Sequence, residues 1–364
     1  MQYLDEFRNA AVAQEIAARI RAEADHAVTF MEICGTHTMA IARYGIKALL
    51  PPHVKLISGP GCPVCVTPQA EIDRFIALGR EPDVILTSFG DMLRVPGSNT
   101  TLEAERARGA DVRVVYSPLD AVDIARAHPE RRVVFCGVGF ETTTPAVALA
   151  VLEAQQSGTT NFSILCAHKV IPPALIALAS DPDIALDGLI CPGHVSAIIG
   201  SETYEPIARD YGLPCVITGF EPLDILQAIL MLLRQANAHE PRVEIQYNRV
   251  VSPHGNPAAT ACAARVFTTV DAEWRGLGVI PGSGLRVRDE FAAHDAARFL
   301  PPLETIPDKE TICQCGLILK GKQAPTACPA FGTACTPTNP IGPCMVSNEG
   351  ACAAEYRYAT RRTD

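Results

Sequence analysis

The densest group of residues that could do chemistry is a set of thiols near the C-terminus. The last 52 residues hold six of the fourteen cysteines, namely Cys313, Cys315, Cys328, Cys335, Cys344 and Cys352. Glycine and proline surround them, and the segment shows almost no helical or strand periodicity. A segment so poor in regular structure cannot order itself by burying apolar surface. The pattern therefore predicts that a metal ion or a metal cluster holds this region together.

A further thiol, Cys34, precedes His37 by three residues in the segment CGTHT. Thiolate and imidazole ligands suit iron, zinc or copper. Thr36 or Thr38 could cap the helix that follows, whose N-terminal dipole would lower the pKa of the Cys34 thiol. The alternative is a buried cysteine beside a capping loop, but the glycine and the two threonines favour a reactive site.

Cys62 and Cys65 form a C-x-x-C motif in the segment GPGCPVC, after a predicted strand. At a strand-to-helix junction this spacing is typical of a redox dithiol. The same pair could supply half of a structural zinc site. Because the sequence contains no second C-x-x-C motif, a four-thiol zinc site is the weaker interpretation.

Glu141, in GVGFETT, and His194, in CPGHVS, also follow predicted strands. A carboxylate at position 141 could move protons or stabilise a metal, and an imidazole at position 194 could act as an acid or base. The glycines before Glu141 lack the Gly-Lys-Ser/Thr ending of a phosphate-binding loop. A capped turn and a hydrogen-bonded structural histidine therefore stay open as alternatives.

Composition and charge exclude some classes of protein. The net charge of −9 argues against nucleic acid or an anionic membrane as the main partner. The sequence contains no run of 18 apolar residues, so no membrane span is predicted. The N-terminal segment lacks the continuous apolar stretch of a signal peptide, so we expect a cytoplasmic protein. In that reducing compartment, metal binding or thiol chemistry is expected rather than a disulfide framework.

Short β-rich runs that alternate with helical segments must position these residues. The strand candidates are residues 28–33, 54–58, 83–88, 112–117, 132–136, 162–167, 187–191 and 214–218. The runs are almost continuously apolar, which indicates strands buried on both faces of parallel sheets. Ligands gather beyond the carboxyl ends of such strands, where the motifs of Cys34, Cys62, Glu141 and His194 lie.

The order of these segments predicts an α/β fold with two similar parallel-sheet α/β sandwich domains, residues 26–128 and 129–240. We expect a small irregular domain at residues 241–364, with a long helix over 257–274 before the cysteine-rich tail. Residues 1–25 predict an amphipathic helix, which we expect to pack on the C-terminal region.

Taken together, the motifs resemble the HypD family of hydrogenase maturation factors. The matching segments are CGTHTMAIARYGI (34–46), GPGCPVCVTP (59–68), GFETTTP (139–145), CPGHVSAIIG (191–200) and the tail from Cys313 to Tyr358. They cover the chain nearly end to end. The resemblance implies two similar α/β domains and a third domain around a [4Fe-4S] cluster.

The resemblance also implies a function. Proteins of this family help to build the Fe(CN)2(CO) group of [NiFe]-hydrogenases, as a scaffold with redox activity rather than a conventional turnover enzyme. They act with a small partner, HypC, whose N-terminal cysteine helps to hold the iron. The carrier HypE, loaded by HypF, delivers cyanide.

Carried over to this sequence, the resemblance assigns roles to individual residues. It implies Cys34 as a ligand of Fe(II), with His37 adjacent, and Cys62 and Cys65 as redox thiols. The family's cluster spacing, C-x14-C-x6-C-x16-C, falls on Cys313, Cys328, Cys335 and Cys352. Cys315 and Cys344 are then spare, although spacing alone does not exclude them as ligands. Glu141 and Glu349 are then acid groups near the chemistry. Independently of the resemblance, His37, Glu141 or His194 could transfer protons.

Two other functions stay open from the sequence. An Fe-S-dependent disulfide reductase would use the same Cys62–Cys65 pair and cluster on an external substrate. A non-catalytic interaction protein would use zinc to hold the cysteine-rich tail together.

Overall fold

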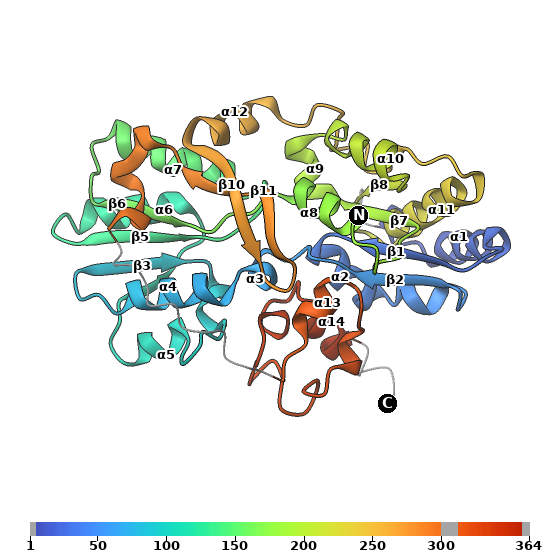
Figure 1. Cartoon of the computed structure of the whole chain (residues 1–364), viewed down its shortest axis with the longest axis horizontal. Coiled ribbons are helices and arrows are strands. Elements are labelled where there is room, and N and C mark those ends of the chain that lie inside the picture. Colours follow the sequence, from blue (N-terminus) through green and yellow to red (C-terminus); the bar gives the residue numbers. More distant parts are fainter. Residues whose placement is uncertain (1–4, 300–311, 359–364) are drawn as a thin grey trace.

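Two parallel β-sheets lie side by side in the computed structural model, which describes residues 5–299 and 312–358 (Figure 1). Helices cover the sheets, and the cysteine-rich C-terminal region packs beneath one of them (Figure 1). The α/β class predicted from the alternation of strands and helices is confirmed.

The first sheet has the strand order β2-β1-β7-β8-β9, and every neighbouring pair is parallel. Its strands are β1 (Val28–Glu32), β2 (Val54–Ser58), β7 (Gly188–Pro192), β8 (Cys215–Thr218) and β9 (Val243–Ile245). All residues of β7 are buried, as expected for a strand with helices on both faces.

One face of this sheet is covered by α1 (Ala10–Glu23), α2 (Gly35–Tyr44) and α11 (Pro222–Ala238). The opposite face is covered by α8 (Ile171–Ala179), α9 (Gly193–Ile199) and α10 (Glu205–Tyr211). The alternate side chains of each strand therefore enter two different cores.

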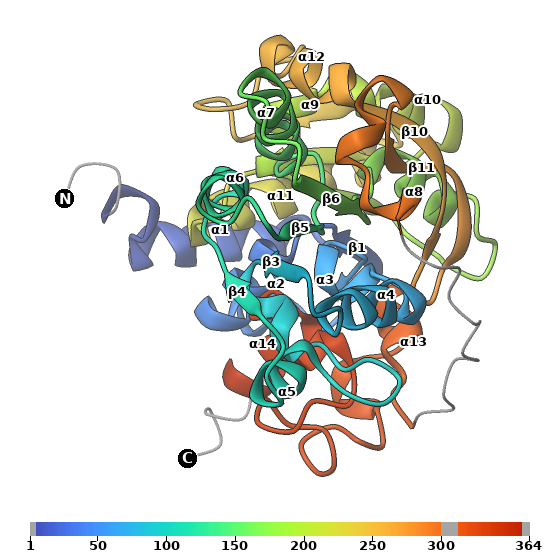
Figure 2. The ribbon, with the colours of Figure 1, turned by 90° about the vertical axis from the view of Figure 1, so that its left-hand side faces the viewer.

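The second sheet has the order β4-β3-β5-β6, again all parallel. Its strands are β3 (Val84–Ser88), β4 (Val112–Val114), β5 (Arg132–Gly137) and β6 (Phe162–Cys166). On one side lie α6 (Pro118–Ala127) and α7 (Thr144–Gln156), and on the other α4 (Gln69–Gly79) and α5 (Leu102–Ala107) (Figure 2).

The strands are not grouped as the first four and the next four, as the sequence order had predicted. The chain leaves the first sheet after β2, builds the whole second sheet and returns at β7. The boundary expected at residue 128 falls between β4 and β5, which belong to the same sheet. The predicted grouping differs from the observed one because sequence periodicity identifies strands but does not show which strands pair.

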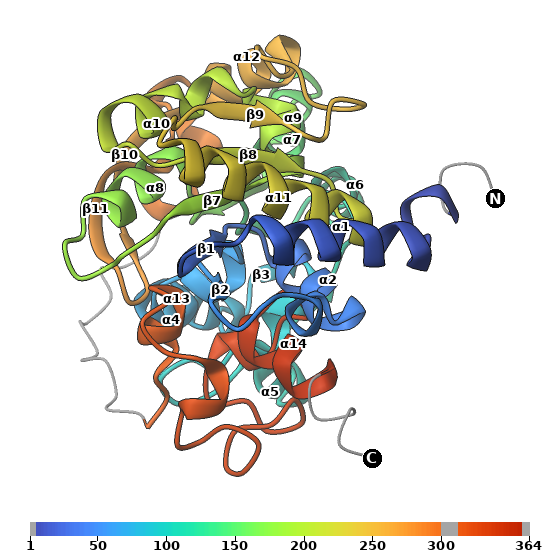
Figure 3. The same cartoon turned by 90° about the vertical axis from the view of Figure 1, so that its right-hand side faces the viewer.

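The N-terminal helix is present, but its packing differs from the expectation. α1 lies along α11 (Figure 3), where Ile16 and Ile20 join the core that contains Leu226 and Ile229. The expected packing on the C-terminal region is therefore wrong. The physical reason is that α11 offers a long apolar face beside the first sheet.

The long helix expected over residues 257–274 ends halfway. α12 spans Pro257–Val266, and the chain then forms the antiparallel hairpin of β10 (Phe267–Trp274) and β11 (Gly278–Val287). From Thr268 to Glu273, residues of β10 alternate between partly buried and exposed positions, which is a strand pattern and not a helical one. The hairpin reaches down towards α3 (Pro63–Val66) and α13 (Cys315–Leu319) (Figure 1).

The C-terminal region is irregular, as predicted. Besides α13 it contains α14 (Ala351–Tyr358) and the 3-10 helices η7 (Pro325–Ala327) and η8 (Pro343–Met345). α14 packs against α2, and η8 contacts α3. The remaining 3-10 helices are η1 (Asp5–Phe7), η2 (Ile46–Leu49), η3 (Gly90–Arg94), η4 (Glu202–Tyr204), η5 (Asp289–His294) and η6 (Ala296–Arg298).

Candidate metal and thiol site

Neighbouring strands of the first sheet end at one edge, and the segments that follow carry five of the predicted site residues, Cys34, His37, Cys62, Cys65 and His194. Because β2, β1, β7 and β8 are adjacent and parallel, their carboxyl ends lie side by side. Cys62 follows β2, Cys34 follows β1, and His194 follows β7. The strand order therefore places the loop of Cys34 between the loops of Cys62 and His194.

Cys34 is the N-cap residue of α2, and its side chain is buried. Burial, and next the Glu349 carboxylate, raise the pKa of the Cys34 thiol to about 12. The backbone N–H groups of Thr36 and His37 act in the opposite direction but are outweighed. The start of the helix thus acts in the expected direction, but the expected net lowering of this pKa is wrong. A bound metal cation would supply the positive charge that a buried thiolate needs.

Thr36 and Thr38 do not cap α2 as expected, because Cys34 occupies the N-cap position. The Thr36 hydroxyl donates to Oε1 of Glu349 at 2.7 Å, and the Thr38 hydroxyl donates to Oε1 of Glu32. Burial raises the pKa of Glu349 above its ordinary value. The two hydroxyls thus hold one buried carboxyl group, that of Glu32, and one partly buried carboxyl group, that of Glu349, near Cys34.

Glu32 is a site residue that the sequence interpretation missed. It is buried at the end of β1, and its Oε2 accepts a hydrogen bond from the Cys34 backbone at 3.1 Å. Burial raises the pKa of Glu32 to about 7. It lines a pocket of about 260 Å³ between α2 and the C-terminal region. The available signal was an acidic residue that ends an otherwise apolar strand just before CGTH.

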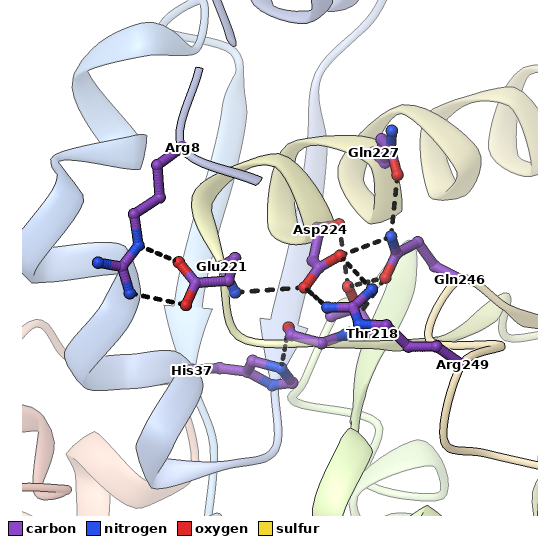
Figure 4. A network of polar contacts seen from close by, with 9 residues as sticks. Arg8, His37, Thr218, Glu221, Asp224, Gln227, Gln246 and Arg249 are labelled. Atoms are coloured by element: carbon purple, nitrogen blue, oxygen red, sulfur yellow. Dashed lines mark hydrogen bonds and ion pairs between the residues drawn. The ribbon is translucent and has the colours of Figure 1, made fainter. Parts of the chain in front are cut away.

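His37 is fully buried and is held by the loop after β8 (Figure 4). Its Nε2 donates to the Gly219 carbonyl at 2.9 Å, whereas Nδ1 has no hydrogen-bond partner. Burial lowers the pKa of His37 to about 4, so the ring is neutral near pH 7. Both His37 and His194 stack on Phe220, with ring centroids 4.8 and 4.0 Å from it. The structure therefore brings the two predicted histidines together.

Cys62 and Cys65 form a disulfide at the start of α3, with their Cα atoms 5.2 Å apart. Both side chains are buried. The backbone N–H of Gly35 donates to the Gly61 carbonyl at 3.0 Å, which joins this loop to the start of α2. The predicted redox pair thus lies beside Cys34, in the disulfide form.

The six C-terminal cysteines gather in one region, and five of them are buried. Side-chain hydrogen bonds link Cys315 to Cys313 and to Cys344. Burial, followed by the electrostatic effect of the other thiols, raises the pKa of Cys352. These other thiols are Cys313, Cys335, Cys315 and Cys328, so the three other predicted cluster ligands all lie within electrostatic reach of Cys352. Four thiolates are the donor set of an iron-sulfur cluster.

Arg275, at the tip of the hairpin, joins the disulfide loop to this cysteine-rich region. Its backbone N–H donates to the Val66 carbonyl at 2.8 Å, and its Nε donates to the Thr67 carbonyl at 2.9 Å. Its Nη2 is buried without a hydrogen-bond partner. The guanidinium acts electrostatically on Cys313 and Cys315. An orphaned cationic donor near these thiols fits a region built to hold a negatively charged group.

Glu141 occupies a different place, after β5 of the second sheet. Its Oε1 accepts a hydrogen bond from the Ile171 backbone at 2.8 Å, and its Oε2 has no partner. Burial raises the pKa of Glu141 to about 7. It lines a pocket of about 270 Å³ together with residues of α7, α9, α12 and the hairpin. Glu141 thus lies where the end of β5 meets α8 and α9, and its described contacts do not include Cys34.

Within residues 5–299 and 312–358, no three His, Cys, Asp or Glu side chains are arranged to hold a single metal ion. Across the same part of the chain, the helices are too short or too polar to pass through a lipid bilayer.

Comparison with known proteins identifies the family. The HypD family model, described as "Hydrogenase formation hypA family", matches residues 11–359. The chain is 50% identical to the hydrogenase maturation factor HypD of Azotobacter vinelandii, over 100% of this chain and 98% of that protein. It is 49% identical to HypD of Cupriavidus necator, over 98% and 97%, and 43% identical to HypD of Escherichia coli K12, over the whole of both chains. The chain therefore belongs to the HypD family of hydrogenase maturation factors.

Proposed function

We propose that this maturation factor is the scaffold on which the Fe(CN)2(CO) group of [NiFe]-hydrogenases is assembled, in complex with a HypC-type partner. The iron is the substrate, and Cys34 binds it as a thiolate together with a cysteine of that partner. Iron that carries cyanide and CO is soft and prefers thiolate ligands. The observation that supports this proposal best is that Cys34, the Cys62–Cys65 pair and Glu349 share one edge of the first sheet.

We assign a [4Fe-4S] cluster to Cys313, Cys328, Cys335 and Cys352, where it would supply electrons. Two observations support this assignment. The other three thiols raise the pKa of Cys352, and Nη2 of Arg275 is buried without a hydrogen-bond partner. The contact between η8 of the cysteine-rich region and α3 supports electron transfer from such a cluster to the redox pair.

Oxidation of the Cys62–Cys65 dithiol can supply the electrons that release cyanide from its carrier. A HypE-type carrier, loaded by HypF, would present cyanide as a thiocyanate on a cysteine. The Cys62 and Cys65 thiols form their disulfide and release two electrons and two protons. The S–CN bond breaks, cyanide passes to the iron held by Cys34, one proton restores the carrier's thiol, and the second goes to a base. His37, with a free Nδ1, and Glu349 are the candidate bases at this edge.

The test is anaerobic co-purification with a HypC-type partner, followed by infrared spectroscopy. Cys34→Ala should abolish the CN and CO bands while the visible absorption of the cluster stays intact. Cys262→Ala is the matched control, because Cys262 is a half-buried thiol on α12 whose sulfur contacts the Pro145 carbonyl. Bands that survive in Cys34→Ala would remove Cys34 as the essential ligand.

The alternative function is an Fe-S-dependent disulfide reductase for an external substrate. The position of the disulfide next to the cysteine-rich region favours it. Its burial argues against it, because the side chains of Cys62 and Cys65 are only 3% and 0% exposed. Catalytic reduction of an added disulfide by the purified protein would support this alternative.

A further inference from the structure

A charged group that no site assignment uses lies behind His37, in the first turn of α11. Asp224 is fully buried, and its Oδ1 and Oδ2 accept hydrogen bonds from Nη1 and Nη2 of Arg249 at 3.0 and 2.5 Å (Figure 4). Nε2 of Gln246 also donates to Oδ1, at 2.9 Å, and the Glu221 backbone donates to Oδ2, at 3.3 Å. A buried carboxylate with this many donors is held in one arrangement, because breaking the set would leave charges unpaired.

This carboxylate supports the loop that follows β8. A Cβ built on Gly219 would lie 2.2 Å from Oδ2 of Asp224, so the carboxylate rests directly on the backbone at that position. The Gly219 N–H donates to Oε1 of Gln246 at 3.2 Å, and the Thr218 hydroxyl lies 2.9 Å from the same oxygen. Gln246 therefore holds the peptide unit before Gly219, while Asp224 packs against Gly219 itself and holds the Glu221 N–H two residues further on.

The Gly219 carbonyl in turn fixes the state of His37. A carbonyl oxygen can only accept a hydrogen bond, so the neutral ring carries its proton on Nε2. The lone pair is then on Nδ1, the buried nitrogen without a partner. Histidines that bind metals donate their second N–H to a carbonyl or carboxylate in the same way.

We propose that Asp224, paired with Arg249, is a positioning residue for His37: it holds the Gly219 carbonyl in place and thereby sets the tautomer and orientation of the imidazole. The inference rests on the proposed function, because it supplies the Nδ1 lone pair that a ligand or base beside Cys34 needs. The described contacts of Asp224 do not include Cys34, so its effect on the site is transmitted through Gly219 and His37.

Through this arrangement the loop after β8, in the second half of the chain, contributes to the Cys34 site. His37 is 182 residues away from Gly219 in sequence and meets it only because β1, β7 and β8 are neighbours. If the loop shifts, the ring can carry its proton on Nδ1 instead. The lone pair would then be on Nε2, which faces the loop, and Nδ1 would no longer offer one.

The first test reads the tautomer directly, without iron. The protein is labelled with 15N-histidine, the His37 signals are assigned with a His37→Gln variant, and the ring nitrogen shifts are compared with those of Asp224→Asn. We expect one pyrrole-type and one pyridine-type nitrogen in the unmodified protein, and averaged shifts in the variant. Arg8→Ala is the control, because it removes an ion pair with Glu221 on the outer side of the same loop. It should leave the His37 signals unchanged.

A second variant keeps the test decisive if Asp224→Asn does not fold, as judged by circular dichroism. Arg249→Lys keeps the positive charge but loses the two-pronged contact, and it should shift the His37 signals in the same direction. Unchanged His37 signals in the folded variants would overturn the proposal.

A third measurement separates this proposal from the proposed function. In the complex with a HypC-type partner, iron retention should weaken about tenfold or more in the same variants, as is typical for second partners of metal-binding histidines. Altered His37 signals with unchanged iron retention would support the positioning role and remove His37 from the proposed chemistry. Unchanged His37 signals in the Asp224 and Arg249 variants, together with loss of iron from His37→Gln, would have the opposite meaning. They would remove the positioning role of Asp224 and support His37 in the proposed chemistry.

Discussion

The backbone of Gly61 rests on the backbone of Cys34: a Cβ at position 61 would lie 2.2 Å from the Cys34 nitrogen and 2.5 Å from its Cα. The loop of the Cys62–Cys65 pair can therefore approach the thiol residue this closely only with glycine at that position. The hydrogen bond from Gly35 to the Gly61 carbonyl fixes the same approach. Backbone packing, and not side-chain contacts, thus sets how close the loop of the redox pair lies to Cys34.

Gly61→Ala should separate the loop from Cys34. The added methyl group would meet backbone atoms that cannot turn aside, so we expect a loss of about 2–3 kcal/mol in the free energy of unfolding. Urea unfolding under anaerobic conditions measures it. Gly90→Ala is the control, because the nearest atom to its Cβ would be 3.8 Å away. Equal stability of the two variants would contradict the close packing.

The parts of this site that could be predicted from the sequence are local ones. Cys34 with His37, and Cys62 with Cys65, were recognised because a short spacing and a strand end suffice to define them. The α/β class followed from apolar runs of strand length. Each of these features depends on residues that are neighbours along the chain.

The parts that could not be predicted depend on long-range pairing. Sequence periodicity does not show that β1 pairs with β7, and without that pairing the contact of His37 with Gly219 is invisible. Glu32 was missed because its role depends on burial beside Cys34. The raised pKa of Cys34 follows from the same burial, which outweighs the local helix effect.

The cluster assignment predicts different effects for two buried cysteines of the C-terminal region. Cys328→Ala should bleach the visible absorption of the anaerobically purified protein and lower its iron and sulfide content, because one of the four proposed thiolate ligands is lost. Cys344→Ala is the matched control and should keep both. The reverse pattern would exchange the two residues in the ligand set, and unchanged spectra in both variants would remove Cys328 from it.

Arg275→Gln should loosen the loop of the redox pair. The variant loses the hydrogen bond from the guanidinium to the Thr67 carbonyl, worth about 1 kcal/mol, or about fivefold in a local opening equilibrium. We expect faster reduction of the Cys62–Cys65 disulfide by dithiothreitol, measured by timed alkylation and mass spectrometry. Arg286→Gln, an exposed position on the same hairpin, should reduce at the original rate. Equal rates in all three proteins would show that Arg275 does not restrain the loop.

Glu141 should make the stability of the chain fall as pH rises. Burial raises its pKa in the folded state from the ordinary 4.5 to about 7, so between these values the folded state binds more protons than the unfolded state. Stability is therefore lost from about pH 4.5 upward and stays lower above pH 7, by about 3 kcal/mol at most. Glu141→Gln removes this titration, because an amide stays neutral throughout the range.

The variant should consequently gain stability relative to the unmodified protein between pH 5 and pH 8, as measured by urea unfolding at several pH values. Glu32, whose pKa is also raised to about 7, titrates in both proteins, so only the difference between them reports on Glu141. A difference that stays constant across this range would mean that Glu141 is charged in the folded state. Its Oε2 would then need a partner that compensates the charge, since the described structure provides none.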